Sequence, residues 1–263
     1  MAGGTGGRSA RPALAPADLL FTQGFGTRRE CAALVVSGLL EVEGMGVVDD
    51  LDHAIDVAGE LWFRVGGGER WPSRERALLA LHKPAGHECS LKPRHHPSVY
   101  TLLPEPLRRR GVQPVGRLDA DTTGVLLFTD DGALLHRLAS PKHHVAKVYA
   151  VGCRHPVDAE QLERLRAGVL LRDENETVRA AACEASGERG LRLTLTEGKY
   201  HQVKRMVAAV GNRVESLERV AFGPVQLEGL APGQWRWLDA ETASARGAQA
   251  PARGDASGPS PRS

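Results

Sequence analysis

The segment 114–132 (PVGRLDADTTGVLLFTDDG) combines a guanidinium, several carboxylates and two glycines in one short stretch. Gly116 and Gly124 bracket a polar loop, and a glycine beside a carboxylate lets the backbone bend and a substrate approach closely. If the loop is extended, Arg117 and Asp119 point into the same cleft, because alternate residues of an extended chain share a face. A carboxylate so placed acts as a nucleophile or a base, or stabilises positive charge that develops in a substrate. Asp119 is therefore the first candidate for a catalytic residue.

The same loop permits a second interpretation, a calcium site. Asp119, Asp121, Thr123, Gly124 and Asp130 fall at positions 1, 3, 5, 6 and 12 of a calcium-binding loop. However, position 12 prefers Glu, and the apolar run after Gly124 indicates a strand, so no pair of helices frames the loop. A plain polar turn is the third interpretation.

A second segment, 140–151 (SPKHHVAKVYAV), concentrates basic residues around one tyrosine. Aromatic side chains that stack on bases, set among cations, are typical of RNA-binding surfaces. The alternative is a tyrosine half-buried in a strand beside a solvated basic loop. On the functional interpretation the aromatic residue is Tyr149, and the candidate RNA contacts are Lys142, His143, His144 and Lys147.

A third segment, 196–212 (TEGKYHQVKRMVAAVGN), predicts a helix from Tyr200 to Val210. On a helical wheel its apolar residues share one face, whereas His201, Lys204 and Arg205 lie on the opposite face. Such a basic face is often merely solvated. Beside a cleft that holds a nucleic acid, it contacts the phosphate backbone instead.

Neither the histidines nor the cysteines indicate a metal site. In the pairs His95-His96 and His143-His144 the side chains point to opposite sides of a strand, and no carboxylate lies at a metal-binding spacing. The four cysteines are scattered without a C-x-x-C pair, and we expect free, buried thiols.

Stretches rich in glycine, alanine and proline divide the 263 residues into five parts. Residues 1–16 and 241–263 cannot bury apolar surface, and we expect disordered tails. Residues 66–77 begin with three consecutive glycines and are predicted to link a small domain, 17–65, to a large one, 78–240. Strand-like and helix-like segments of the large domain are interspersed without strict alternation, which favours an α+β fold.

Charge is distributed unevenly between the two predicted domains. Residues 79–238 contain 23 Lys/Arg against 18 Asp/Glu, a net of +5, whereas residues 17–65 contain three Arg against nine Asp/Glu, a net of −6. The basic excess of the large domain is compatible with a polyanionic partner. No apolar run approaches a membrane span and the N-terminus lacks a signal-peptide core, so we expect a cytoplasmic protein.

Taken together, these segments resemble the RNA pseudouridine synthase family typified by the small-subunit rRNA enzyme RsuA. The resemblance rests on GRLDADTTGVLLFTDDG, SPKHHVAKVYAV and EGKYHQVKRMVAAVGN, in this order, with HKPAGHECS before them and LAPGQWRWL after them. In the segment HKPAGHECS, His82 replaces the asparagine that is usual in the family. The resemblance covers residues 78–240 and implies a mixed, mostly antiparallel sheet with a central cleft. Residues 17–65 resemble the small RNA-binding S4 domain that precedes this fold.

The resemblance implies a role for each matching residue. Asp119 matches the catalytic aspartate, Arg117 the arginine that helps hold the flipped-out position, Tyr149 the tyrosine that packs on uracil, and Lys204 the basic residue paired with the aspartate. Such an enzyme detaches the base and rejoins it through C5 without redox or group transfer from another molecule, so no cofactor and no metal is implied. We expect RNA contacts from Arg28, Arg29, Lys83, Lys142, His143, His144, Lys147, Lys199, His201 and Arg205.

The expected substrate is ribosomal RNA, free or in a partly assembled subunit, and the expected state is a monomer without a membrane partner. Small-subunit rRNA is favoured because KYHQVKRM and the doublet His143-His144 are closer to the small-subunit enzyme. Large-subunit rRNA remains the alternative target. A non-catalytic RNA-binding protein on the same scaffold is the alternative from another functional class, although Asp119, Tyr149 and Lys204 argue against it.

Overall fold

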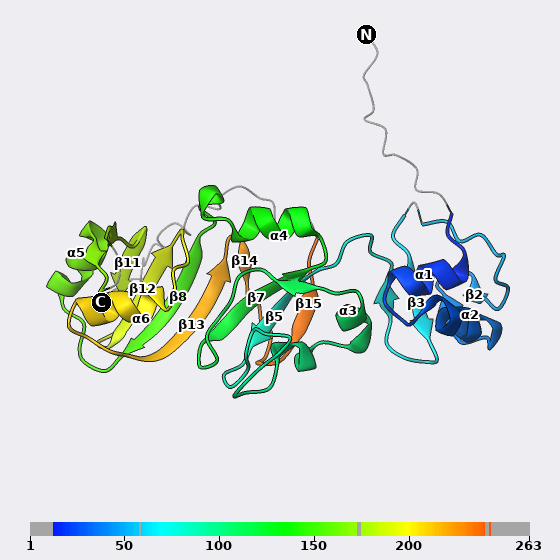
Figure 1. Cartoon of the computed structure of the whole chain (residues 1–263), viewed down its shortest axis with the longest axis horizontal. Helices are drawn as coiled ribbons and strands as arrows, with labels where there is room; N and C mark the ends of the chain where they lie inside the picture. Colours follow the sequence, from blue (N-terminus) through cyan, green and yellow to red (C-terminus); the bar gives the residue numbers. More distant parts are fainter. Residues whose placement is uncertain (1–12, 58, 173–174, 240–241, 243–263) are drawn as a thin grey trace, which may run out of the picture.

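Two β-sheets lie at opposite ends of the chain's long axis, as the computed structural model shows (Figure 1). The structure describes residues 13–57, 59–172, 175–239 and 242. Most of the two predicted tails therefore lies outside the described residues. The expected α+β class is confirmed.

The first sheet belongs to an N-terminal unit with two helices, α1 (Pro16–Thr22) and α2 (Arg28–Val36). α2 begins with a capping box, in which the Thr27 side chain accepts from the Glu30 backbone N–H and the Glu30 carboxylate accepts from the Thr27 backbone N–H. Four strands follow in the order β2-β1-β3-β4. They are β1 (Leu40–Val42), β2 (Gly46–Val47), β3 (Trp62–Val65) and β4 (Trp71–Pro72).

The predicted boundaries of this unit need two corrections. Residues 66–77 are not simply a linker, because β4 pairs with β3 and the side chain of Trp71 is buried. The N-terminal tail also ends earlier than residue 16, since Leu14 bridges Ile55. Backbone pairing at both ends of the unit makes these contacts, which glycine and proline content alone did not reveal.

The second sheet forms the large domain and runs in the order β11-β12-β8-β13-β7-β5-β15, with β14 on β13 and β6 on β7. Every pair is antiparallel except β13 with β7, which confirms the mixed, mostly antiparallel sheet. The strands are β5 (Leu78–Lys83), β6 (Gln113–Pro114), β7 (Thr123–Thr129), β8 (Lys147–Cys153), β11 (Ala182–Ala185), β12 (Gly190–Leu195), β13 (Val214–Phe222), β14 (Val225–Gln226) and β15 (Trp235–Trp237).

Short helices pack around this sheet, with α4 against β7, α5 against β11 and α6 against β13. They are η1 (Val99–Leu102), α3 (Glu105–Arg109), α4 (Gly132–Ala139), η2 (Pro141–His143), α5 (Ala159–Ala167) and α6 (Gln202–Ala209). A separate hairpin joins β9 (Val169–Leu170) to β10 (Thr177–Val178). None of the helices within the described residues is long and apolar enough to span a membrane.

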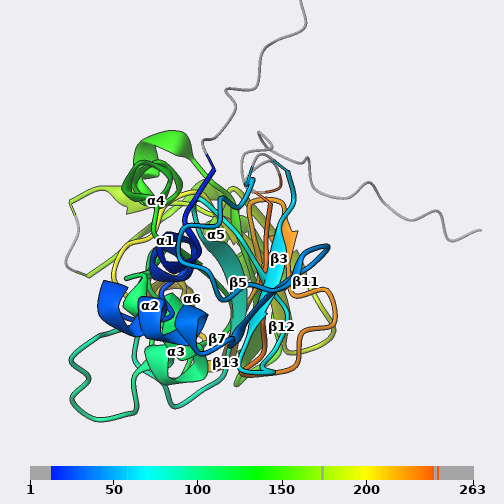
Figure 2. The same cartoon turned by 90° about the vertical axis from the view of Figure 1, so that its right-hand side faces the viewer.

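An aromatic cluster joins the N-terminal unit to the edge of the large sheet. The Trp71 ring makes edge-on contacts with Phe25, at 5.5 Å between ring centres, and with Trp237, at 5.4 Å. Beside it, Arg110 donates to Gln23 of the N-terminal unit and to Asp130 at the end of β7. Seen along the long axis, the N-terminal unit lies in front of the large sheet (Figure 2).

Two local features of the large domain follow from its residue types. Asp158 caps the N-terminus of α5, and Gly168 ends that helix with a backbone φ of +123°. The four cysteines are buried and unpaired, as expected.

Candidate active site

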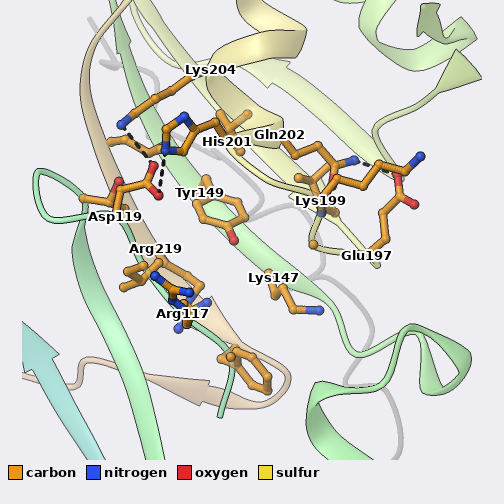
Figure 3. A pocket seen from close by; sticks show the side chains of 18 of the residues that line it. Arg117, Asp119, Lys147, Tyr149, Glu197, Lys199, His201, Gln202, Lys204 and Arg219 are labelled. Carbon is orange, nitrogen blue, oxygen red and sulfur yellow. Dashed lines mark hydrogen bonds and ion pairs between the residues drawn. The ribbon is translucent and has the colours of Figure 1, made fainter. Parts of the chain in front are cut away.

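A cavity of about 340 Å³ opens beside the loop that carries Asp119. Its walls come from the loop 115–122, from β8, from the segment 195–204 that leads into α6, and from β13. Figure 3 shows Tyr149 among these side chains, with Asp119 and Lys204 on one side and Lys147 on another. The cavity therefore unites the three segments that the sequence analysis identified.

Lys83, the last residue of β5, holds the loop in place. Its side chain is fully buried, and its Nζ donates to the carbonyl oxygens of Pro84 (3.0 Å), Ala120 (3.1 Å) and Thr122 (2.8 Å). Burial lowers the pKa of Lys83. The predicted RNA contact is wrong for Lys83, because an ammonium buried among three backbone carbonyls does not reach a phosphate in solution. Its contacts make it a positioning residue for the loop instead.

Gly124 lets β7 approach β13 closely. The two strands pair in parallel, with Gly124 opposite Arg219, and Gly124 has a φ of +110°. A Cβ at this position would lie 2.2 Å from the carbonyl oxygen of Arg219. The close approach that the sequence predicted at this glycine is thus made by a neighbouring strand.

Asp119 lies between two basic side chains from the segment around α6. Lys204 Nζ donates to Asp119 Oδ2 at 3.1 Å, and His201 Nε2 lies 3.2 Å from Oδ1. Lys204 also donates to both carboxylate oxygens of Asp121, at 2.7 and 2.9 Å. The pairing of Lys204 with Asp119 is therefore present, but Asp121 shares the same ammonium.

The sequence predicted that His201 belongs to the helix, and this prediction is wrong. α6 begins at Gln202, and His201 precedes it with a left-handed φ of +47°. Residues other than glycine adopt this conformation rarely. The imidazole lies against the carboxylate of Asp119 instead of on the outer face of a helix.

The shared ammonium changes the protonation of the groups around it. Burial lowers the pKa of Lys204, but its hydrogen bonds to Asp121 and Asp119 outweigh burial and hold the pKa above its usual value. Burial likewise raises the pKa of Asp121, but the hydrogen bond from Lys204 outweighs it and leaves this pKa below its usual value. Lys204 is therefore a cation, and Asp121 a carboxylate, at neutral pH.

Tyr149 and Arg219 form a cross-strand pair between β8 and β13. Residues directly opposite each other in antiparallel strands point to the same face. Lys147, two residues before Tyr149, shares that face and is opposite Phe222. Burial, followed by the positive charge of Arg219, lowers the pKa of Lys147 to about 8, although Glu197 opposes the shift.

Two groups of predicted RNA contacts surround the cavity. Lys142, His143 and His144 are exposed in and just after η2, whose first residue lines the cavity. Lys199 lines the cavity itself, and Arg205 is half-buried on α6. Their contacts with RNA stay predictions.

The other predicted contacts, Arg28 and Arg29, lie in the first turn of α2, in the N-terminal unit. Arg28 forms an ion pair with Asp18, and its guanidinium lies 4.3 Å from the centre of the Phe21 ring. Both arginines are exposed, so their role also stays a prediction.

The calcium interpretation of the loop is wrong. Residues 123–129 form an extended strand, at whose far end Asp130 accepts hydrogen bonds from Arg110 at 2.6 and 2.8 Å. At the near end the ammonium of Lys204 lies between Asp119 and Asp121. A calcium loop wraps its ligands around one point, whereas this one is stretched out.

Sequence reasoning gave no role in the site to Asp121, which shares the ammonium of Lys204 with Asp119, or to Arg219, which lines the cavity. The spacing of Asp119 and Asp121 offered a usable sign, since two carboxylates two residues apart on an extended loop face one lysine. Arg219, one arginine within a strand-like run, carried no such sign. Only the register of β13 with β8 reveals that it faces the cavity.

Comparison with known proteins gives a consistent result. A family model described as RNA pseudouridylate synthase matches residues 77–209. The ribosomal small subunit pseudouridine synthase A of Pasteurella multocida is 39% identical over 211 residues, covering 80% of this chain and 87% of the relative. An RNA pseudouridine synthase of Bacillus subtilis named YtzG is 40% identical over 228 residues, covering 85% and 94%. A solved structure titled "Crystal structure of pseudouridylate synthase" is 33% identical, with a TM-score of 0.61, over 88% of this chain and 98% of the other.

Proposed function

The chain belongs to the RNA pseudouridylate synthase family, a family of isomerases, and from this premise we propose that it converts uridine to pseudouridine in small-subunit ribosomal RNA. One observation carries the proposal. The Asp119 carboxylate, bonded to Lys204 at 3.1 Å, shares a cavity with the ring of Tyr149.

The cavity suits a single nucleotide turned out of its RNA. The reaction breaks the bond from uracil N1 to ribose C1′, turns the base and joins its C5 to C1′, so the nucleotide must leave the stack. The volume of the cavity, about 340 Å³, falls within the range of small-molecule sites. With the ribose at Asp119, the uracil packs on Tyr149, and Arg117 at the cavity wall helps hold the flipped nucleotide.

The carboxylate of Asp119 is prepared for chemistry at C1′. Lys204 and His201 fix both of its oxygens, at 3.1 and 3.2 Å, and so limit the orientations of the side chain. A carboxylate held in this way attacks as a nucleophile, removes a proton or stabilises a positively charged ribose.

The choice of RNA rests on the names of relatives. Several of them are named ribosomal small subunit pseudouridine synthase A, including those of Pasteurella multocida and Escherichia coli. Chemical mapping of pseudouridine across both large rRNAs, in cells that lack the gene and in cells complemented with it, tests the assignment. We expect the cells that lack the gene to lack one pseudouridine in small-subunit rRNA. If they lacked a pseudouridine in large-subunit rRNA alone, large-subunit rRNA would be the target instead.

The catalytic assignment is tested by Asp119→Asn, which is nearly isosteric. We expect its melting temperature to stay close to wild type while release of tritium from 5-tritiated uridine in rRNA is abolished. Asp49→Asn, an exposed acid of the N-terminal unit, is the matched control and should keep full turnover. A non-catalytic RNA-binding protein would instead show no tritium release from the wild type, and turnover in Asp119→Asn would refute the role of Asp119.

The setting of the enzyme completes the proposal. We infer an S4-like role in RNA binding for the N-terminal unit, supported by its two helices followed by strands and by the exposed Arg28 and Arg29. We infer a cytoplasmic enzyme, because its proposed substrate is rRNA, and a monomer, because Asp119 and Lys204 already meet Tyr149 within a single chain.

A further inference from the structure

Arg219 has hydrogen-bonding groups that the protein does not satisfy. Its side chain lines the cavity and is only 2% exposed. Its Nε donates to the carbonyl oxygen of Val125 at 2.7 Å, and Nη2 is buried with no partner among the described residues. A guanidinium carries five N–H groups, and leaving a buried one unpaired costs about 1–3 kcal/mol. An acceptor on a group that enters the cavity would satisfy this N–H of Arg219.

The charge of Arg219 is also unbalanced. No carboxylate in the described part of the chain forms an ion pair with Arg219 or with Lys147. The Arg219 Cζ and the Lys147 Nζ lie 5.1 and 5.4 Å from the centre of the same ring, that of Phe222. Burial and this neighbouring cation lower the pKa of Lys147 to about 8, although the carboxylate of Glu197 in the cavity wall opposes the shift. Two cations that lie close together in the buried floor of the cavity, where the dielectric constant is low, favour a ligand that is negative or becomes negative.

The position of Arg219 selects the base as that ligand in preference to a phosphate. Arg219 is directly opposite Tyr149 in the strand register, so its guanidinium lies beside the ring on which the proposed uracil packs. It is buried in the floor, whereas the more exposed Arg117 and Lys199 line the same cavity and suit the hydrated phosphates of the backbone. A base entering edge-first reaches the floor before any phosphate does.

We propose that Arg219 is a further catalytic residue, which donates a hydrogen bond to a carbonyl oxygen of the flipped uracil and stabilises the charge on the detached base. This inference rests on the proposed function. When the bond from N1 to C1′ breaks, its electron pair leaves with the base, so uracil becomes an anion whose charge spreads onto its carbonyl oxygens. A fixed cation that meets charge as it develops lowers the barrier without reorganising.

The same contact serves the base before and after it turns. Rotation about the axis through N3 and C6 exchanges N1 with C5, and it also exchanges the two carbonyl groups. The guanidinium of Arg219, fixed through Nε to Val125, therefore meets a carbonyl oxygen in both orientations. C5 then bonds to C1′, which removes the negative charge from the base, and as C5 loses its proton N1 takes one up, so the base stays neutral.

The test compares single-turnover rates on an rRNA fragment that contains the target uridine. For Arg219→Met we expect a loss of at least about 100-fold, as for removal of one oxyanion-binding donor. RNA affinity should change by less than about threefold, since phosphate contacts dominate it. Arg219→Lys keeps the positive charge but loses the planar guanidinium, and its single-turnover rate should lie between those of the wild type and Arg219→Met. Arg236→Met is the matched control, a half-buried strand arginine outside the cavity wall, and should keep the wild-type rate.

A substrate change tests the same contact without any variant. Sulfur accepts hydrogen bonds poorly, so 2-thiouridine or 4-thiouridine at the target should slow the wild type about tenfold, the effect of roughly one charge-assisted bond. Arg219→Met should be no slower on the thio substrates than on uridine, because the two changes remove one interaction. The assignment of Arg219 is overturned if the variant keeps the wild-type rate, or if both thio substrates react at the rate of uridine. If the wild type itself forms no pseudouridine, the proposed function fails, and the role of Arg219 fails with it.

Discussion

Replacing Lys83 by methionine tests whether a buried lysine, and not a surface contact, sets the position of the catalytic loop. Lys83→Met keeps the length of the side chain and removes the ammonium. The change leaves the carbonyl oxygens of Pro84, Ala120 and Thr122 without the donor that now lies 2.8–3.1 Å away. Since Ala120 is next to Asp119, the effect should reach the reaction centre.

The magnitude follows from two opposing contributions. Hydrogen bonds to a charged group contribute about 1.5–3 kcal/mol each to stability. Relief of the desolvation cost of the buried ammonium offsets a large part of this sum, as it does for buried charges generally. We expect a net loss of about 2–4 kcal/mol, which corresponds to roughly 5–15 °C in melting temperature for a chain of this size. A displacement of Asp119 by about 1 Å would lower turnover about 100-fold.

Thermal melting and single-turnover tritium release measure these two effects. Lys142→Met, at an exposed lysine of η2, is the control and should leave the melting temperature unchanged. If Lys83 instead bound phosphate, Lys83→Met would melt like the wild type and lower the salt slope of RNA binding by about one unit. That result, or wild-type turnover in the variant, would refute the positioning role.

Two further predictions concern the charges of the cavity. Lys204→Met should lose turnover at least about 100-fold, while the salt slope of its RNA binding changes by at most about one unit. Asp121→Asn should lose only about tenfold in turnover, because Asp119 retains its own bond to the lysine. A loss in Asp121→Asn equal to that in Lys204→Met would show that Asp121 is as important as Asp119. Lys147 has a pKa of about 8 in the free protein, and RNA favours its charged form, so its pKa rises on binding. Binding should therefore take up a proton above pH 8, and affinity should weaken as pH rises from 8 toward 10.5, the usual pKa of lysine. Titration calorimetry in buffers of different ionisation enthalpy measures the uptake, and Lys147→Arg, which stays charged, should abolish it.

The sequence predicted the fold class and most elements of the large domain because their patterns are local. The apolar run after Gly124 predicted the strand β7, and the periodicity from Tyr200 to Val210 predicted the helix α6. The strand order, by contrast, depends on contacts between distant segments. The parallel pairing of β13 with β7 brings Arg219 next to Gly124, 95 residues before it, and no local pattern encodes that neighbour.

The errors share a physical cause, which is that burial overrides residue type. Lys83 is a surface residue by composition, but a strand buried along its whole length carries it inside, where backbone carbonyls satisfy it. Trp71 follows a run of glycines typical of a linker, yet its ring packs against Phe25 and Trp237. His201 looks helical by spacing, but the helix starts one residue later and leaves its ring free to meet Asp119.

The charges of the cavity are arranged in the sense that the proposed reaction requires. On one side the carboxylates of Asp119 and Asp121 meet the ammonium of Lys204, and the buried ammonium of Lys83 acts on both from behind the loop. On the other side Lys147 and Arg219 lie in the strands without a carboxylate partner among the described residues. Breaking the bond from N1 to C1′ produces positive charge on the ribose and negative charge on the base. A nucleotide with its ribose at Asp119 and its base at Arg219 therefore has each developing charge beside the opposite fixed charge, and the reverse orientation would place like charges together.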